Sequence, residues 1–161
     1  MNLVTEKYRF NLKDFNSTSS LVYGIGNVGR QDDGLGWAFI DWLNEDGIIT
    51  NAEIIKHYQL HLEDADLISY KKRVLFIDAT KEVSVDKFEI VKIKPKLDFT
   101  FTSHDISIAS ILSTCQLCFD YLPEVYLLKI RGYEWELKEG LTNLAMENLC
   151  AVKNEFEKMI K

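Results

Sequence analysis

The sequence predicts an α/β fold, a single-domain three-layer sandwich in which helices flank a mostly parallel, twisted sheet. Continuous apolar runs, such as residues 21–23 and 74–77, are typical of strands buried on both faces of a parallel sheet. Amphipathic helical patterns separate these runs, and strands that alternate with helices form parallel sheets. A length of 161 residues fits one domain with a substantial core. We assign residues 20–161 to this domain and residues 1–19 to an N-terminal extension whose pattern is too weak to classify.

The first apolar run opens a strand–loop–helix unit. From residue 35 onward the apolar positions repeat at helical spacing, as Leu35, Ala38, Phe39, Trp42 and Leu43. Asp33 stands where the N-cap of this helix is expected. Further strands are expected at 52–58, 73–78, 88–94 and 125–130, and further helices at 63–70, 108–119 and from 142 onward. Lysines around 88–94 suit an edge strand, and residues 8–12 are a candidate for an extra one.

Composition narrows the class of protein. The net charge is −6, so no basic surface offsets the phosphate charge of a nucleic acid, and we expect no nucleic-acid partner. Charged residues interrupt the N-terminus where a signal peptide needs an apolar segment, and no window is apolar enough to span a membrane. Three cysteines, an odd number, fit a reducing compartment better than a disulfide framework. These features predict a cytoplasmic protein with no membrane partner.

The glycine-rich turn after the first strand formally matches a dinucleotide-binding fingerprint. Gly24, Gly26 and Gly29 have the G-x-G-x-x-G spacing, which works when a helix begins at the glycines and receives a pyrophosphate. Here the helical pattern begins only after Asp33. The acidic pair Asp32 and Asp33 would also repel a pyrophosphate at this position. The sequence therefore disfavours a dinucleotide site.

Three side chains from separate segments are expected at one edge of the sheet. Asp33 follows the first strand, Asp78 ends the strand at 73–78, and His104 opens the helix whose apolar positions run from 108 to 119. In open α/β sheets, ligands bind beyond the carboxyl ends of the strands. Two carboxylates and an imidazole suit a borderline divalent metal with room for substrate ligands. Taken singly, the same residues have ordinary alternatives as a helix cap, a solvated strand end and a surface histidine.

These motifs resemble those of the hydrogenase maturation endopeptidases. The resemblance spans roughly residues 20–160. It lies in Gly-Ile-Gly-Asn at 24–27, Arg-Gln-Asp-Asp-Gly-Leu-Gly at 30–36, Phe-Ile-Asp-Ala at 76–79 and Ser-His-Asp at 103–105. Gln-Leu at 59–60 and Gly-Leu-Thr at 140–142 add to it. Two features depart from the family pattern: the residues before the first strand, and Gln31, where a small residue is common.

The resemblance implies a specific activity. Such enzymes remove a C-terminal extension from the large subunit of a nickel–iron hydrogenase after the metal has been inserted. It implies that Asp33, Asp78 and His104 are the catalytic residues and also contact the nickel. That nickel is carried by the substrate, so no resident organic cofactor is expected. The implied partner is the hydrogenase large-subunit precursor.

Two questions stay open at the level of sequence. A metal can activate the attacking water, or a carboxylate can act as general base, so the peptidase is of the aspartic or the metal-assisted type. Neither a Gly-x-Ser-x-Gly elbow nor a His-Glu-x-x-His helix is present. The alternative function is a noncatalytic binding module on the same fold, either a nickel-sensing hydrogenase chaperone or a dinucleotide-binding protein.

Overall fold

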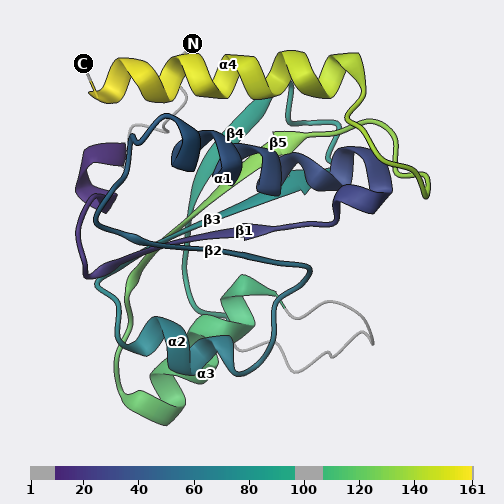
Figure 1. The fold of residues 1–161 in the computed structure, drawn as a ribbon. Helices are drawn as coiled ribbons and strands as arrows, with labels where there is room; N and C mark the ends of the chain where they lie inside the picture. The colour runs from purple at the N-terminus through teal and green to yellow at the C-terminus, as the bar shows by residue number, and fades with distance from the viewer. Residues whose placement is uncertain (1–9, 97–106, 161) are drawn as a thin grey trace.

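A five-stranded sheet forms the middle layer of the computed structural model, which describes residues 10–96 and 107–160 (Figure 1). The strand order is β2-β1-β3-β5-β4. All neighbours pair in parallel except β4, which is an antiparallel edge strand beside β5. The prediction of a mostly parallel sheet with an edge strand near 88–94 is confirmed. The strands are β1 (Ser20–Ile25), β2 (Glu53–His57), β3 (Arg73–Thr80), β4 (Phe88–Ile93) and β5 (Glu124–Arg131).

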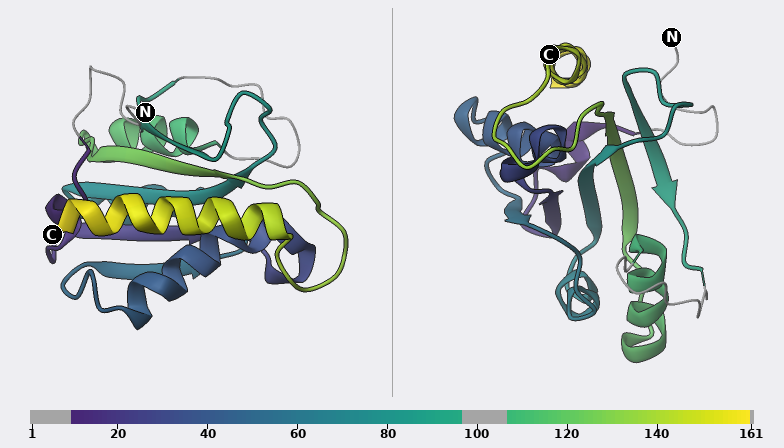
Figure 2. Two further views of the ribbon diagram at one scale, coloured as in Figure 1. Left: turned by 90° about the horizontal axis from the view of Figure 1, so that it is seen from above. Right: turned by 90° about the vertical axis from the view of Figure 1, so that its right-hand side faces the viewer.

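Helices cover both faces of this sheet and give the predicted three layers (Figure 2). Helices α1 (Leu35–Glu45) and α4 (Asn143–Ile160) cover one face, and α2 (Asp64–Ser69) and α3 (Ile108–Phe119) cover the other. Buried side chains form a separate hydrophobic cluster on each face. Among the described residues, no helix combines the length and apolar character needed to cross a bilayer.

The segment before β1 belongs to the core of the α1–α4 face. It contains a short 3-10 helix, η1 (Leu12–Phe15), and buries Phe10, Leu12 and Phe15. The rings of Phe10 and Phe156 of α4 lie 5.5 Å apart, so the segment before β1 packs against α4. The strand expected at 8–12 is not formed by its described part, because Phe10 and Asn11 lack regular structure and Leu12 begins η1; residues 8 and 9 lie outside the described residues.

Helices α1, α2 and α4 start within one residue of the predicted positions, whereas α3 begins at Ile108, later than the opening expected at His104. Ser107 and Thr142 cap α3 and α4 by accepting hydrogen bonds from the amides of Ser110 and Ala145. The prediction that Asp33 caps α1 is wrong, because α1 starts without a side-chain cap. A second 3-10 segment, η2 (Val28–Gly34), runs directly into the helix and places Asp33 inside a turn.

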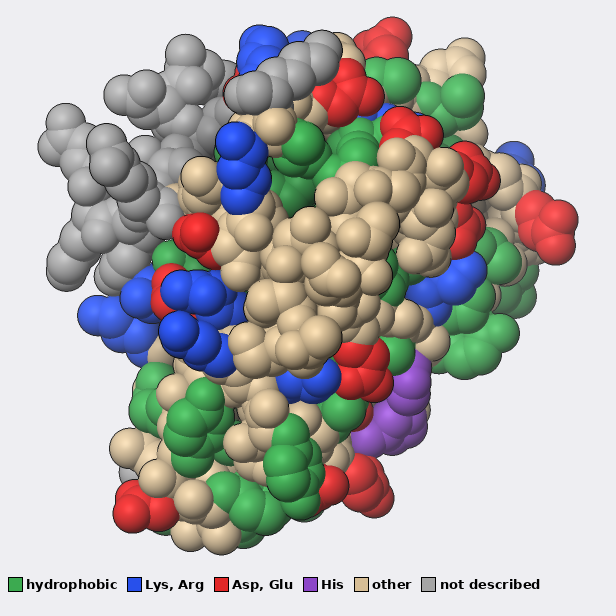
Figure 3. Space-filling view, turned by 60° about the vertical axis from the view of Figure 1, so that its left-hand side comes forward, with side chains coloured by type: hydrophobic (Ala, Val, Ile, Leu, Met, Phe, Trp, Pro, Cys, Tyr) green, Lys and Arg blue, Asp and Glu red, His purple; other side chains and the backbone are tan. Residues whose placement is uncertain are grey.

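Exposed apolar residues gather at the edge where β3 and β5 begin. They lie at the ends of α2 and α3 or just beyond: Tyr70, Leu117, Phe119, Tyr121 and Leu122. Figure 3 shows apolar side chains over this helical layer and charges of both signs on the rest of the face. This edge is opposite to the one that carries the carboxyl ends of the parallel strands.

Gly36 lets α1 lie directly against the carboxyl ends of β1 and β3. A Cβ atom at this position would overlap the carbonyl oxygen of Ile25 and lie 2.8 Å from that of Ile77. Both atoms belong to the backbone of central strands and cannot move aside. The close approach fixes the start of α1 over the junction between these two strands.

Replacing Gly36 with alanine should lower the free energy of unfolding by about 3 kcal/mol, because overpacking must push the helix from the sheet. Urea unfolding followed by circular dichroism measures this change. Gly29→Ala is the matched control, since its added Cβ meets only a side-chain atom, Asn27 Oδ1, at 3.2 Å. Its stability should change by less than about 1 kcal/mol. Equal stability of Gly36→Ala and the parent would contradict the packing argument.

Candidate functional site at the carboxyl edge of β1 and β3

The loop after β1 is folded back on itself. The amide of Asn27 donates to the carbonyl of Asp33 over 3.1 Å, and Asn27 Oδ1 accepts from the amide of Gly29 over 2.9 Å. Gly26 has φ +154°, and a Cβ there would overlap the Asp33 carbonyl oxygen. The glycine at this position is thus needed to close the loop. The fingerprint glycines do not open an α-helix, because α1 begins only at Leu35.

Asp33 is held half-buried in this closed loop. Burial raises the pKa of its carboxyl group above the ordinary value of 3.8. The nearby charges of Arg30 and Lys81 and the backbone amide of Asn27 oppose this rise without cancelling it. Asp33 is therefore a carboxylate that accepts a proton more readily than one in water does.

Asp78 lies at the carboxyl end of the neighbouring strand and is also half-buried. Strand β3 extends two residues further than the sequence pattern indicated, to Thr80, so Asp78 is inside the strand. Gly24 of β1 pairs with Ile77, which places Asp78 level with the end of β1. The amide of Ala79 donates to Asp78 Oδ1 over 2.8 Å and orients the carboxylate.

The structure brings Asp33 and Asp78 to the same edge of the sheet. A Cβ atom on Gly36, three residues after Asp33, would lie 2.8 Å from the carbonyl oxygen of Ile77, which precedes Asp78. After β1 the chain continues to β2 at one edge of the sheet, and after β3 it continues to β4 at the other edge. Ligands bind in α/β folds at such a point, where the strand order reverses. His104, the third predicted residue, lies outside the described residues. Within residues 10–96 and 107–160, no three His, Cys, Asp or Glu side chains are grouped to hold a metal ion.

Asp32 ties the loop to a segment about a hundred residues away. Its fully buried carboxylate accepts hydrogen bonds from the amides of Tyr133, Glu134 and Thr142 and from the hydroxyl of Thr142, over 2.7–3.1 Å. Gln31 adds to this contact, because its backbone N–H donates to the carbonyl of Lys138 over 2.9 Å. These contacts of Asp32 could not be predicted from the sequence, because its partners are remote and mostly backbone groups.

Comparison with solved structures identifies proteins of the same fold. The NiFe hydrogenase maturation protease HycI from Thermococcus kodakarensis KOD1 aligns with a TM-score of 0.69 and 20% identity, covering 92% of this chain and 97% of that chain. The hydrogenase maturating endopeptidase HybD from E. coli aligns with a TM-score of 0.64 and 18% identity, covering 86% and 92%. An uncharacterized protein from Wolinella succinogenes aligns with a TM-score of 0.57 and 15% identity, covering 89% and 99%. The sequence matches no protein-family model and no curated protein. The chain has the fold of the hydrogenase maturation proteases.

Asp32→Asn should lower the free energy of unfolding by about 3 kcal/mol, because an amide nitrogen cannot accept from the donors that face it. Chemical unfolding at neutral pH measures the loss. The control is Asp41→Asn, which removes only an exposed ion pair with Lys56 and should cost less than about 1 kcal/mol. If both variants are equally stable, the buried hydrogen bonds of Asp32 do not hold the two segments.

Asp33→Asn should make the protein more stable at neutral pH than the parent. The raised pKa means that folding disfavours the charged carboxylate, a cost that the neutral amide avoids. Below pH 3.8 the acid is protonated in both states, so the gain should vanish there and grow as pH rises through the folded pKa. Urea unfolding from pH 3 to pH 7 tests the sign. A variant that is less stable than the parent throughout this range would show that burial does not dominate at Asp33.

Proposed function

We propose that this protein is a cytoplasmic endopeptidase that removes the C-terminal extension of a nickel–iron hydrogenase large-subunit precursor. The nickel ion carried by the precursor is part of the substrate and positions it at the carboxyl edge of β1 and β3. The observation that carries the proposal is the placement of Asp33 and Asp78 at this edge. The shared fold of proteins named as hydrogenase maturation proteases supports it.

The donor atoms suit a substrate-borne metal. Carboxylate oxygens and an imidazole nitrogen are acceptable ligands for nickel, a borderline ion. Asp33 and Asp78 supply the carboxylates, and His104 is proposed as the third contact. Both acids are half-buried, so each can reach a bound precursor. A site with few protein ligands leaves positions for groups of the precursor.

Hydrolysis adds water across the scissile peptide bond. The hydroxide joins the carbonyl carbon, the carbon–nitrogen bond breaks, and a proton passes to the leaving amine. Asp33 is suited to take the proton from water, because burial raises its pKa and makes it a better base. Asp78, oriented by the amide of Ala79, is suited to hold the nickel. Nickel can in addition lower the pKa of a bound water and polarise the carbonyl group.

Variants at the three positions should separate chemistry from recognition. Asp33→Asn and Asp78→Asn should each reduce kcat/KM by about a hundredfold or more, because a general base or a metal contact is lost. His104→Ala should mainly raise KM, so saturating precursor should restore much of the rate. Intact-mass spectrometry of nickel-loaded precursor, incubated with each variant, measures the shortening.

The matched control is Asp66→Asn, an exposed acid in the first turn of α2 on the opposite face of the sheet. It should cleave like the parent, and precursor without nickel should stay intact with every variant. Complex formation without shortening would replace the peptidase with a nickel-sensing chaperone. Full activity of both aspartate variants would remove Asp33 and Asp78 from the site.

A further inference from the structure

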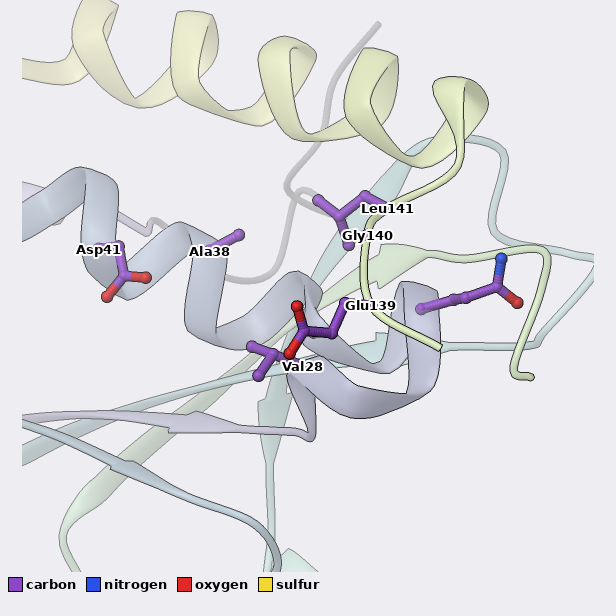
Figure 4. Close-up of a pocket in the computed structure, with 8 residues that line it drawn as sticks. Val28, Ala38, Asp41, Glu139, Gly140 and Leu141 are labelled. Atoms are coloured by element: carbon purple, nitrogen blue, oxygen red, sulfur yellow. The ribbon is translucent and has the colours of Figure 1, made fainter. Parts of the chain in front are cut away.

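A groove lies beside the candidate site, between the η2–α1 unit and the segment that leads into α4. Its volume is about 300 Å³, and Gly34, which directly follows Asp33, forms part of its lining. From there it extends along α1 to Asp41. Figure 4 shows Val28, Ala38 and Asp41 on one side and Glu139 to Leu141 on the other. The groove is continuous with the loop that carries Asp33.

The far wall of this groove is fixed by buried hydrogen bonds. The Asp32 carboxylate accepts from both the amide and the hydroxyl of Thr142, immediately after Leu141. The backbone N–H of Gln31 donates a hydrogen bond to the carbonyl of Lys138, immediately before Glu139. Gly140 between them has φ +103°, a left-handed conformation that glycine accepts without strain. The wall is therefore anchored on both sides of the residues that face the groove, and a ligand need not order it on binding.

The lining combines an apolar floor with negative charge. Val28 is 46% exposed, although apolar side chains of this size are usually buried, and Ala38 and Leu141 extend the apolar surface. Glu139 is exposed and has no hydrogen-bond or ion-pair partner among the described residues. The carboxylate of Asp41 is already paired with Lys56 over 2.8 Å. Glu139 is thus the carboxylate of the groove that remains for a cationic ligand.

The length of the groove fits a short extended peptide. Gly34 directly precedes α1, and Asp41 lies seven positions further along the chain (41−34). At the rise of an α-helix this separation is about 10 Å. An extended chain covers that distance in about three residues. If the nickel-bearing body of the precursor occupies the edge at Asp33 and Asp78, the chain beyond the scissile bond must leave along a neighbouring surface. This groove begins next to Asp33.

We infer that the groove is a docking subsite for the C-terminal extension of the precursor, an inference that rests on the proposed function. It takes an extended segment with an apolar side chain over Val28 and a lysine or arginine, within about three residues of it, beside Glu139. The apolar contact supplies binding energy, and the charge pair selects the segment and its register. The groove thereby selects which precursor is held long enough for cleavage.

The test uses two substrates: a fluorescein-labelled synthetic peptide of the whole extension, read by anisotropy, and the nickel-loaded precursor, read by cleavage. Glu139→Lys should weaken peptide binding and raise KM by about tenfold, while kcat stays within about twofold. Val28→Thr, which keeps the shape but replaces a methyl group by a hydroxyl, should raise KM about threefold. Glu157→Lys, the same charge change near the far end of α4, should leave peptide binding and KM unchanged.

A charge exchange decides the register of the peptide. An extension in which the lysine or arginine near the apolar residue is replaced by glutamate should bind the parent poorly and bind Glu139→Lys well. The inference is overturned if the peptide does not bind the parent, if Glu139→Lys and Glu157→Lys bind alike, or if the exchange restores nothing. Peptide binding without any cleavage of the precursor would support the groove and reject the peptidase. Cleavage that is insensitive to both groove variants would support the peptidase and reject the groove as a docking subsite.

Discussion

The carboxylate of Asp32 connects the two segments on which the candidate site depends. It is fully buried and accepts hydrogen bonds from three backbone amides and one hydroxyl in the segment between β5 and α4. A buried charge is stable only when such donors satisfy it. Asp33 follows Asp32 in the chain, so the same contact holds the loop of the candidate base on one side and a wall of the groove on the other. The loop, the candidate site and the groove therefore share one anchor.

Around this anchor, polar groups are satisfied, and the loop contains Gln31, one of two described non-glycine residues with positive φ; the other, Asp120, ends α3. In the described part of the chain, no buried side-chain nitrogen or oxygen lacks a hydrogen-bond partner. Yet Gln31 has φ +47°, and the pKa of Asp33 is raised by burial. Unfavourable conformations and disfavoured charges persist where function requires them and the surroundings hold them in place. Gln31 and Asp33 thus bring a strained backbone and a disfavoured charge within three residues of one another.

The sequence predicted what depends on local pattern. Continuous apolar runs identified the parallel strands, lysines identified the edge strand, and apolar spacing identified α3, although this helix begins at Ile108 and not at His104. It failed where tertiary contacts decide. Asp33 has the residue type and position of a helix cap, but the folded-back loop places it inside the 3-10 segment η2. The partners of Asp32 are backbone amides far along the chain, and backbone amides leave no trace in a sequence. The edge position of Asp33 and Asp78 followed from topology alone, whereas the placement of His104 stays a prediction.

The aromatic contact between Phe10 and Phe156 has a bearing on how the chain is made. These residues are 146 positions apart (156−10), and their rings belong to one hydrophobic cluster with Phe15, Phe39 and Tyr126. A cluster that needs the last helix cannot close while that helix is still inside the ribosome. The cluster of the α2–α3 layer does not include α4, whereas the α1–α4 layer can close only once α4 has left the ribosome. Residues 139–141, which line the groove, shortly precede α4, so the groove belongs to a part of the molecule that closes late.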